Sequence, residues 1–170
     1  MIDSLELINI LKNKNYDFKI HKHQPLYTVE DSLNKRGDIK GVHTKNLFLK
    51  NKKNSFFLIS CEEHEIINLK IVSKLLGIGN VSFAKEIYLN KFLGIKPGSV
   101  SPFALINDKN GLVSFYLEET LYKSKYVNFH PLVNNLTITI ETSKFIEFMI
   151  ENNKKIHIFS SSKGLINSYE

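Results

Sequence analysis

The chain has 170 residues, of which 42% are hydrophobic and 24% are charged, and these values are typical of one soluble globular domain. Its single cysteine, Cys61, excludes an internal disulfide and a multi-cysteine zinc site, and it suits a reducing cytoplasm. The net charge of +6 favours a polyanion such as RNA as a partner, although abundant lysine, asparagine and isoleucine are equally typical of an AT-rich genome.

The N-terminal residues 1–15 carry acidic side chains and interrupted apolar residues instead of a basic start and a continuous apolar run. This pattern predicts a first helix and not an export signal. No apolar stretch approaches the roughly 20 residues that are needed to cross a bilayer. We therefore expect a cytoplasmic protein that does not use a membrane as a partner.

The N-terminal half is predicted to contain two helices, a strand and a hairpin. Ser4 can cap a first helix whose apolar residues, from Leu5 to Leu11, fall mainly on one face, and Tyr16 to Ile20 is expected to form a strand. The spacing of Thr28-Val29-Glu30-Asp31 is that of a capping box, so a second helix begins here and ends at Gly37 or Gly41. The predicted hairpin strands are Asn46 to Lys50 and Ser55 to Cys61.

The C-terminal half is predicted to alternate helices and strands. Asn68 can cap a helix that ends at Gly77, and a further helix from Ala84 to Leu93 stops at Gly94. The remaining elements expected are strands at Phe103–Ile106, Leu112–Leu117, Val127–Phe129, Thr137–Glu141 and Lys155–Phe159, and a helix from Ser143 to about Asn152.

No internal repeat or linker divides the chain, so residues 1–170 are expected to form one domain. Hairpins outnumber crossover helices in the predicted order. The fold class is therefore α/β (α+β), with a mixed, largely antiparallel sheet flanked by helices.

Common catalytic motifs are missing from the sequence. It contains no phosphate-binding loop, no Gly-x-Gly-x-x-Gly fingerprint and no Gly-x-Ser-x-Gly elbow. His21-Lys22-His23 and Cys61-Glu62-Glu63-His64 bring metal-binding residue types together, but adjacent residues of an extended strand point to opposite faces. We therefore expect no metal and no cofactor. At the end of an apolar strand, Cys61 is expected to be a small buried hydrophobic residue and not a nucleophile.

Three segments carry polar residues where a binding site can form. They are His43-Thr44-Lys45-Asn46 just before the hairpin, Gly98-Ser99-Val100-Ser101-Pro102 in a loop, and His130-Pro131-Leu132-Val133-Asn134 at a strand end. Taken singly, each is also explained by structure alone: a solvated lysine, an ordinary loop and a turn.

Together with further stretches, these segments resemble the editing-domain family of bacterial prolyl-tRNA synthetases and its freestanding YbaK-like relatives, in particular the alanyl-tRNA(Pro) deacylases. The resemblance is specific because the stretches occur in the family's order, with similar separations, across almost the whole chain. The matching stretches are Tyr27-Thr28-Val29-Glu30-Asp31, Arg36-Gly37-Asp38-Ile39, residues 43–50, Ser82-Phe83-Ala84, residues 97–103 and residues 130–134.

The resemblance implies a YbaK-like editing domain that hydrolyses the ester between alanine and the terminal adenosine of a proline tRNA. It implies chemistry without a metal or protein nucleophile, in which the ribose hydroxyl beside the ester helps to activate water. The implied catalytic residues are Lys45, which anchors the substrate end, and Gly98. The implied substrate-binding residues are Thr44, Asn46, Ser99, Val100, Ser101, Pro102, His130 and Asn134.

The partners implied are the acceptor end of tRNA(Pro) and a prolyl-tRNA synthetase, and not DNA. Two departures from the family bear on what is recognised. Asn80 stands where relatives often carry an arginine before the Ser-Phe-Ala segment, and Asn135-Leu136-Thr137 is bulkier than the small residues usual there. Both bear on which amino acid is removed and which tRNA is read.

Two other functions remain as alternatives. One is a related deacylase with a different substrate, such as cysteinyl-tRNA(Pro), which would rely on the substrate thiol. The other is a non-catalytic module that binds tRNA or a synthetase, which would keep the basic surface without needing a pocket.

Overall fold

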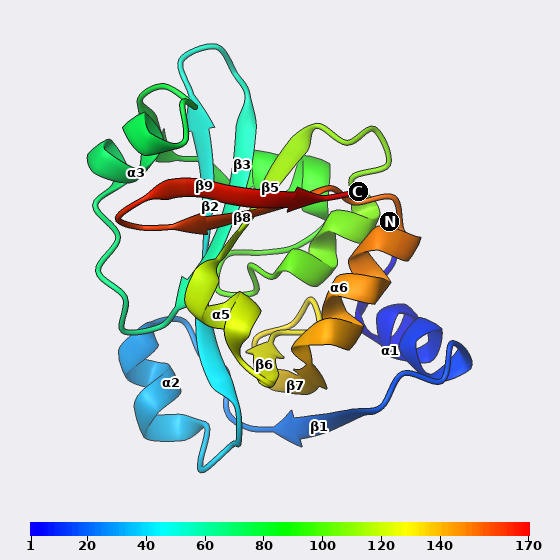
Figure 1. The fold of residues 1–170 in the computed structure, drawn as a ribbon. Coiled ribbons are helices and arrows are strands. Elements are labelled where there is room, and N and C mark those ends of the chain that lie inside the picture. Colours follow the sequence, from blue (N-terminus) through cyan, green and yellow to red (C-terminus); the bar gives the residue numbers. More distant parts are fainter.

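The computed structural model describes residues 1–170, and its centre is one mixed sheet. The strands run in the order β1-β7-β6-β2-β3-β5-β8-β9, and β4 pairs with one end of β2 (Figure 1). Central strands β3, β5 and β8 are parallel neighbours, whereas the flanking pairs β1–β7, β6–β7 and β8–β9 are antiparallel. The strand bounds are β1 Phe18–Lys22, β2 Val42–Asn51, β3 Phe56–Glu62, β4 Val81–Phe83, β5 Val113–Glu118, β6 Tyr126–Phe129, β7 Leu136–Glu141, β8 Ile156–Ser160 and β9 Gly164–Tyr169.

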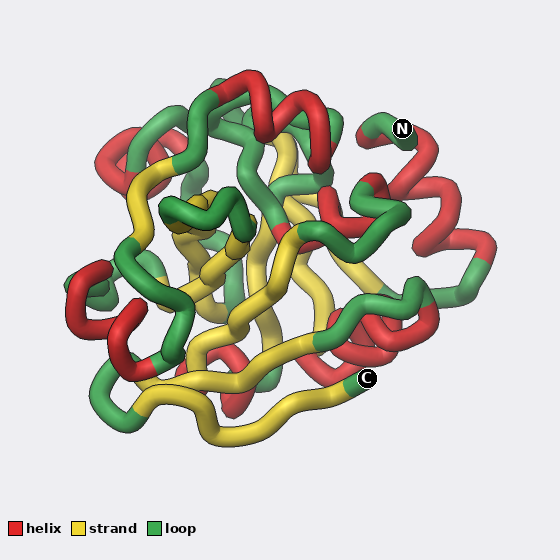
Figure 2. The backbone as a smooth tube through the Cα atoms, turned by 90° about the horizontal axis from the view of Figure 1, so that it is seen from above, coloured by secondary structure: helices red, strands yellow, loops and turns green.

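Helical segments cover much of this sheet, and Figure 2 shows the last strand, which leads to the C-terminus, at the edge of the molecule. The α-helices are α1 Ser4–Asn13, α2 Val29–Lys35, α3 Leu69–Leu75, α4 Glu86–Tyr88, α5 Glu119–Lys123 and α6 Thr142–Glu151. A π-helical turn, Leu89–Leu93, continues α4, and a 3₁₀ helix covers Pro102–Asn107. No helix is long and apolar enough to span a bilayer.

Both faces of the central strands are buried, and this explains why β3 is almost continuously apolar. Phe56 and Leu58 of β3 pack into a large core with α1, α6 and the 3₁₀ helix. The alternate residues Phe57 and Ile59 pack into a smaller core on the other face, together with Val72 of α3. Strand side chains alternate between the two faces, so a strand between two cores is apolar at every position.

The sequence predicted the fold class and most elements, with several errors at the level of local structure. The cap of α1 is Asp3, which forms a capping box with Glu6, and Ser4 lies inside the helix instead. Leu5 was expected on the buried face but is exposed. The first strand begins at Phe18, because Asn15 adopts a left-handed conformation that ends the preceding turn.

The largest error concerns residues 103–106, which were expected to form a strand. They belong to the 3₁₀ helix, which begins with Pro102 and is capped by the Ser101 hydroxyl. Its residues are buried all round, so the apolar run carries no periodicity that distinguishes a strand from a buried helix. The short elements β4 and α5 and the last strand β9 were not predicted.

Strand β2 places the polar segment of the chain at a gap in the sheet. Its first residues, Val42 and His43, pair with β6 on one side, and Leu49 to Asn51 pair with β4 on the same side. On the other side, β2 pairs with β3 along nearly its full length. Thr44, Lys45 and Asn46 therefore lie on a stretch of β2 that has a strand neighbour on one side alone.

Candidate active site

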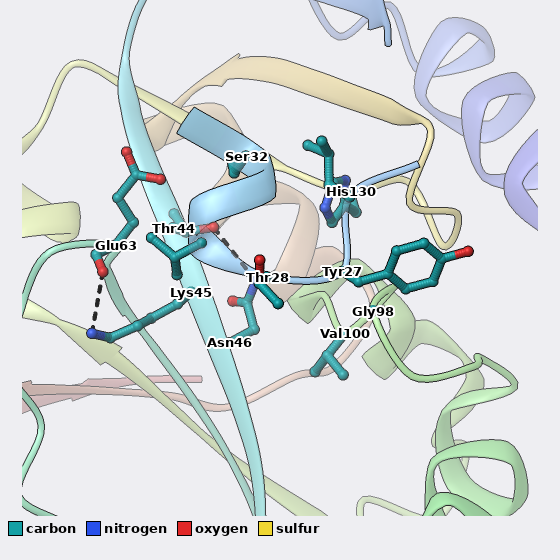
Figure 3. A pocket seen from close by; sticks show the side chains of 12 residues that line it. Tyr27, Thr28, Ser32, Thr44, Lys45, Asn46, Glu63, Gly98, Val100 and His130 are labelled. Atoms are coloured by element: carbon teal, nitrogen blue, oxygen red, sulfur yellow. Dashed lines mark hydrogen bonds between the residues drawn. The ribbon is translucent and has the colours of Figure 1, made fainter. Parts of the chain in front are cut away.

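A cavity of about 210 Å³ opens beside this gap (Figure 3). It is formed by the middle of β2, the start of α2, the loop before the 3₁₀ helix and the end of β6. Most of its lining is polar, because these segments contribute hydroxyl, amide, ammonium and imidazole groups. The sequence-predicted residues that line it are Thr44, Lys45, Asn46, Gly98, Val100 and His130.

The residues of β2 are fixed at the cavity by side-chain hydrogen bonds. The Thr44 hydroxyl donates to the carbonyl oxygen of Asn128 at 2.8 Å, where the pairing of β2 with β6 ends. The Asn46 side chain accepts from the Ser60 hydroxyl at 2.5 Å. Because both are held by neighbouring strands, this wall has a defined shape before any ligand binds.

Lys45 lies within β2 and not before the strand, as the sequence had led us to expect. Its half-buried ammonium group donates to the backbone carbonyls of Glu63 and Glu65 in the turn that follows β3; the distance to the Glu63 oxygen is 3.2 Å (Figure 3). An ammonium group has three N–H donors, so one remains for a ligand. The positive charge is thus anchored at one end of the cavity.

Glu63 also forms a buried ion pair with Arg36, the only arginine of the chain. The guanidinium donates to both carboxylate oxygens, at 2.6 and 2.8 Å, and to the Ser32 hydroxyl at 2.9 Å. The two charged side chains are 12% and 5% exposed. Because α2 has no buried residue of its own, this pair is its main link to the turn that holds Lys45.

His130 is held at the opposite side of the cavity from Lys45 (Figure 3). Its Nδ1 atom lies 2.7 Å from the carbonyl oxygen of Leu136, which can only accept, so Nδ1 carries the proton. Burial lowers the pKa of His130, although this hydrogen bond opposes the shift. The ring is therefore neutral near pH 7, with Nε2 as an acceptor. Nε2 has no partner in the protein and is not among the fully buried unpartnered atoms, so it remains accessible.

Three further histidines form hydrogen bonds near the His130 side of the cavity. His21 and His23 contact the hydroxyls of Thr139 and Thr137 on β7 at 3.0 and 2.8 Å, and His43 contacts the carbonyl oxygen of Ile39 at 3.1 Å. The rings of His23 and His130 are 6.0 Å apart. Burial is the main cause that lowers the pKa of His21 and of His43.

Gly98 brings the loop close to the segment before α2. Its φ of +83° is left-handed, and a side chain there would place Cβ 3.1 Å from a ring carbon of Tyr27. The left-handed conformation favours glycine, and a side chain there would also press on the Tyr27 ring. Gly98 thus determines how closely the two sides of the cavity meet.

Four residues predicted to bind substrate do not line the cavity. Ser99, Ser101 and Pro102 are buried beneath the loop, where Ser101 caps the 3₁₀ helix and Pro102 begins it. The amide of Asn134 donates to the carbonyl oxygen of Leu26 at 3.1 Å and so braces the segment before α2. These four residues therefore support the cavity wall and do not form its surface.

Six lining residues were not predicted as site residues. They come from the start of α2 and from the turn after β3, and they are Leu26, Tyr27, Thr28, Val29, Ser32 and Glu63. The stretch beginning at Tyr27 is among those that resemble the family, which is the one signal that pointed to it. The Arg36–Glu63 pair joins residues far apart in sequence, and no local pattern reveals it.

The turn after β3 also brings Glu62, Glu63 and His64 together, with ligand atoms within 4.8 Å of one another. The expectation that an extended strand separates these groups was wrong, because β3 ends at Glu62 and a turn follows. Both Glu63 oxygens accept from Arg36, and Glu62 accepts from the backbone N–H of His64. Cys61 is fully buried, as expected, and burial raises the pKa of its thiol to about 12.

Comparison with known proteins places this fold and cavity in a family. The sequence model of the aminoacyl-tRNA editing domain matches residues 23–148, which include the whole cavity lining. The chain therefore belongs to the aminoacyl-tRNA editing domain family.

Among its relatives is prolyl-tRNA synthetase associated domain-containing protein 1 of Danio rerio, which is 32% identical over 86% of this chain and 80% of that protein. The prolyl-tRNA editing protein ProX of Acetoanaerobium sticklandii is 32% identical over 73% of this chain and 76% of that protein. A crystal structure described as a candidate trans-editing enzyme for prolyl tRNA synthetase has the same fold, with a TM-score of 0.65 at 15% identity, over 98% of this chain and 99% of that one.

The buried ion pair yields a stability prediction. Arg36→Ala leaves the Glu63 carboxylate buried without its partner, so the free energy of unfolding should fall by about 3 kcal/mol. Denaturant titration measures this change. The double variant Arg36→Ala/Glu63→Ala should lose less than the sum of the single variants. As a control, Lys144→Ala removes an exposed pair with Glu147 and should cost less than about 1 kcal/mol. Equal effects of Arg36→Ala and Lys144→Ala would contradict the assigned role.

The partly buried histidines predict how stability depends on pH. The pKa values of His21, His43, His130 and His157 are lowered, with burial as the largest cause in each. The unfolded chain therefore binds protons first as the pH falls below the ordinary histidine value of about 6.5. The free energy of unfolding should decrease, by on the order of 1 kcal/mol, between about pH 7.5 and about pH 5.5. Urea titrations at the two pH values test this, and a flat profile would contradict it.

Proposed function

We propose that the protein is a trans-editing deacylase that hydrolyses the ester of alanyl-tRNA(Pro). The observation that carries the proposal is the cavity, which an anchored lysine and a fixed neutral histidine line on opposite sides, within the region that matches the editing-domain family. The names of the relatives, which refer to prolyl-tRNA editing and to prolyl-tRNA synthetase, support the tRNA partner.

The cavity suits ester hydrolysis by an oriented water molecule. No nucleophilic thiol reaches it, because Cys61 is buried with a raised pKa. An aminoacyl ester is already activated, so positioning and stabilisation of the developing oxyanion supply much of the rate acceleration. The ribose hydroxyl next to the ester can then assist the attacking water, and the polar walls hold the two in place.

Lys45 is assigned to the anchoring of the substrate end. Two of its three N–H donors are used by the carbonyls of Glu63 and Glu65, which leaves one donor and the full positive charge for the terminal nucleotide. An ammonium group that is already in place loses little side-chain entropy when a ligand binds.

The amino-acid side chain is assigned to the side of the cavity at His130. Each additional methylene changes hydrophobic binding by only about 1–3 kcal/mol, so an enzyme that must spare prolyl-tRNA needs a steric barrier. A ring held by Leu136 at the end of a buried strand is suited to be that barrier. The cavity volume of about 210 Å³ is also that of a small-substrate site.

The role of Lys45 is tested by Lys45→Ala, which should abolish most deacylation of alanyl-tRNA(Pro) in single-turnover assays. Its two hydrogen bonds lie in a turn, so the variant should still fold. Lys45→Arg should also be poor, because a planar guanidinium does not replace a compact ammonium between two carbonyls. Lys12→Ala, on the exposed face of α1, is the control for a change of net charge and should leave turnover unchanged. Near-normal turnover by folded Lys45→Ala would refute the assignment.

Selectivity is tested by His130→Ala, assayed against alanyl-, seryl-, 2-aminobutyryl- and prolyl-tRNA(Pro). If the imidazole is a steric wall, the variant should gain activity on the larger esters. If it is a general acid or base, all substrates should slow together, and the pH profile should lose a limb near the histidine pKa. His157→Ala is the matched control, since that partly buried histidine bonds Ser168 away from the cavity. A uniform loss without a new substrate would contradict the steric role.

Hydrolysis assays with a panel of aminoacyl-tRNAs separate this function from the alternatives. A cysteinyl-tRNA(Pro) deacylase would prefer the thiol-bearing substrate. A non-catalytic module would bind tRNA without releasing an amino acid.

A further inference from the structure

Tyr27 presents an aromatic ring at the rim of the cavity. The residue is 67% exposed, yet it contributes to the cavity lining. Figure 3 shows the ring on the side of Gly98 and Val100, away from Lys45. Because most of the residue is exposed, the ring is open to solvent at the mouth of the site.

Single exposed apolar residues are common on protein surfaces, so exposure alone assigns no role to the ring. What distinguishes Tyr27 is that its backbone is held on both sides. The preceding residue, Leu26, exchanges hydrogen bonds with Asn134, at 3.0 Å for its N–H and 3.1 Å for its carbonyl. The Tyr27 N–H donates to the Asp31 carboxylate at 3.2 Å, while Thr28 caps α2. The backbone that carries the ring is therefore fixed in position.

The glycine opposite supports the same conclusion. A Cβ atom at Gly98 would lie 3.1 Å from Cδ1 of Tyr27, so the ring edge rests on the loop backbone. This contact supports the ring without covering it. A ring that is supported at its edge and open at its face is suited to stack against a second planar group.

The size of the cavity shows which part of the proposed substrate needs such a surface. Pockets that enclose a ligand of drug size have volumes of about 300–1,000 Å³. An aminoacyl-adenosine is of that size, whereas this cavity measures about 210 Å³. If the amino acid and the ribose occupy the cavity, the adenine base must lie outside, at the rim.

We propose that the ring of Tyr27 stacks against the terminal adenine of the tRNA and so holds the ester in the cavity. This inference rests on the proposed function and extends it to the recognition of the base. Stacking on an aromatic side chain tolerates any base, because every base has a π-face, and it contributes enough per base to change affinity by about an order of magnitude. Lys45 and Tyr27 then hold the terminal nucleotide from two sides of the cavity.

The kinetic test compares Tyr27→Ala with Tyr27→Phe on charged tRNA(Pro). The alanine variant should lower kcat/KM about 10-fold, chiefly through KM, and the phenylalanine variant should retain wild-type values because it keeps the ring. Leu33→Ala is the matched control: Leu33 is an exposed apolar residue of the neighbouring helix α2, 49% exposed, and it does not line the cavity. It should behave like the wild type. A Tyr27→Ala protein with wild-type kcat/KM, or a Tyr27→Phe protein as poor as Tyr27→Ala, would overturn the proposal.

A change in the substrate provides a second test. On a charged minihelix whose terminal nucleotide lacks its base, wild type and Tyr27→Ala should be equally slow, because the stacking partner is missing from both. If Tyr27→Ala still costs 10-fold on this abasic substrate, the residue acts by shaping the cavity, and the stacking proposal is refuted.

A binding assay keeps this inference separate from the proposed function. An uncharged minihelix that ends in 2-aminopurine should lose fluorescence on binding to wild type and to Tyr27→Phe, and it should keep its fluorescence with Tyr27→Ala. Failure of wild type to hydrolyse any aminoacyl-tRNA would refute the proposed function, whatever the fluorescence shows. An active wild type whose 2-aminopurine signal does not depend on Tyr27 would refute the stacking alone.

Discussion

The site depends on the point at which β6 leaves β2. The two strands are paired at Val42 and His43, and the ladder then ends, while β3 continues beside β2 to the hairpin. Asn128 of β6 compensates for the lost ladder: its carbonyl accepts from Thr44, and its amide donates to the carbonyls of Lys40 and Val42 at 2.9 and 3.3 Å. The close approach requires Gly41, where a Cβ would lie 3.0 Å from Tyr126.

A polar gap between two hydrophobic cores is stable only if its polar groups are satisfied. A buried hydroxyl or amide without a partner costs about 1–3 kcal/mol. Several such groups would therefore cancel most of the free energy of unfolding of a domain of this size. Here the one fully buried side-chain polar atom without a partner is the Ser4 hydroxyl, which lies in α1 outside the cavity lining. The polar residues behind the gap are hydrogen-bonded to one another: Thr139 donates to the Asn128 side chain at 2.5 Å.

The parts of the fold that the sequence predicts well are those determined by local patterns. The hairpin turn at 51–54, the Thr28 cap of α2 and the Asn68 cap of α3 were all predicted, because each depends on neighbouring residues. The 3₁₀ helix after Ser101 was not, because its residues are buried on every side and its form is decided by packing.

The same distinction applies to the site. The residues of β2 and His130, which the resemblance to the editing-domain family implied, do line the cavity, although taken singly each segment is also explained as a solvated lysine or a turn. Glu63 was not predicted, because its relation to Arg36 arises from the way in which α2 packs on the turn after β3. The loop from Gly98 to Pro102 was expected to present backbone groups to the substrate; the side chains of Ser99 and Ser101 are buried, and the Ser101 hydroxyl caps the 3₁₀ helix.

The two sides of the cavity are therefore built by different physical means. The side formed by β2 and His130 is attached to the sheet, through the ladder of β2 with β3 and the hydrogen bond from His130 to the carbonyl of Leu136 on β7. The side formed by Tyr27 and α2 has no buried residue in its helix, and it depends on the Arg36–Glu63 pair and on Asn134. In the function proposed above, the amino acid lies against the sheet side, because discrimination between side chains of similar size needs a wall that does not yield. The parts of the substrate that every tRNA shares then lie against the helix side.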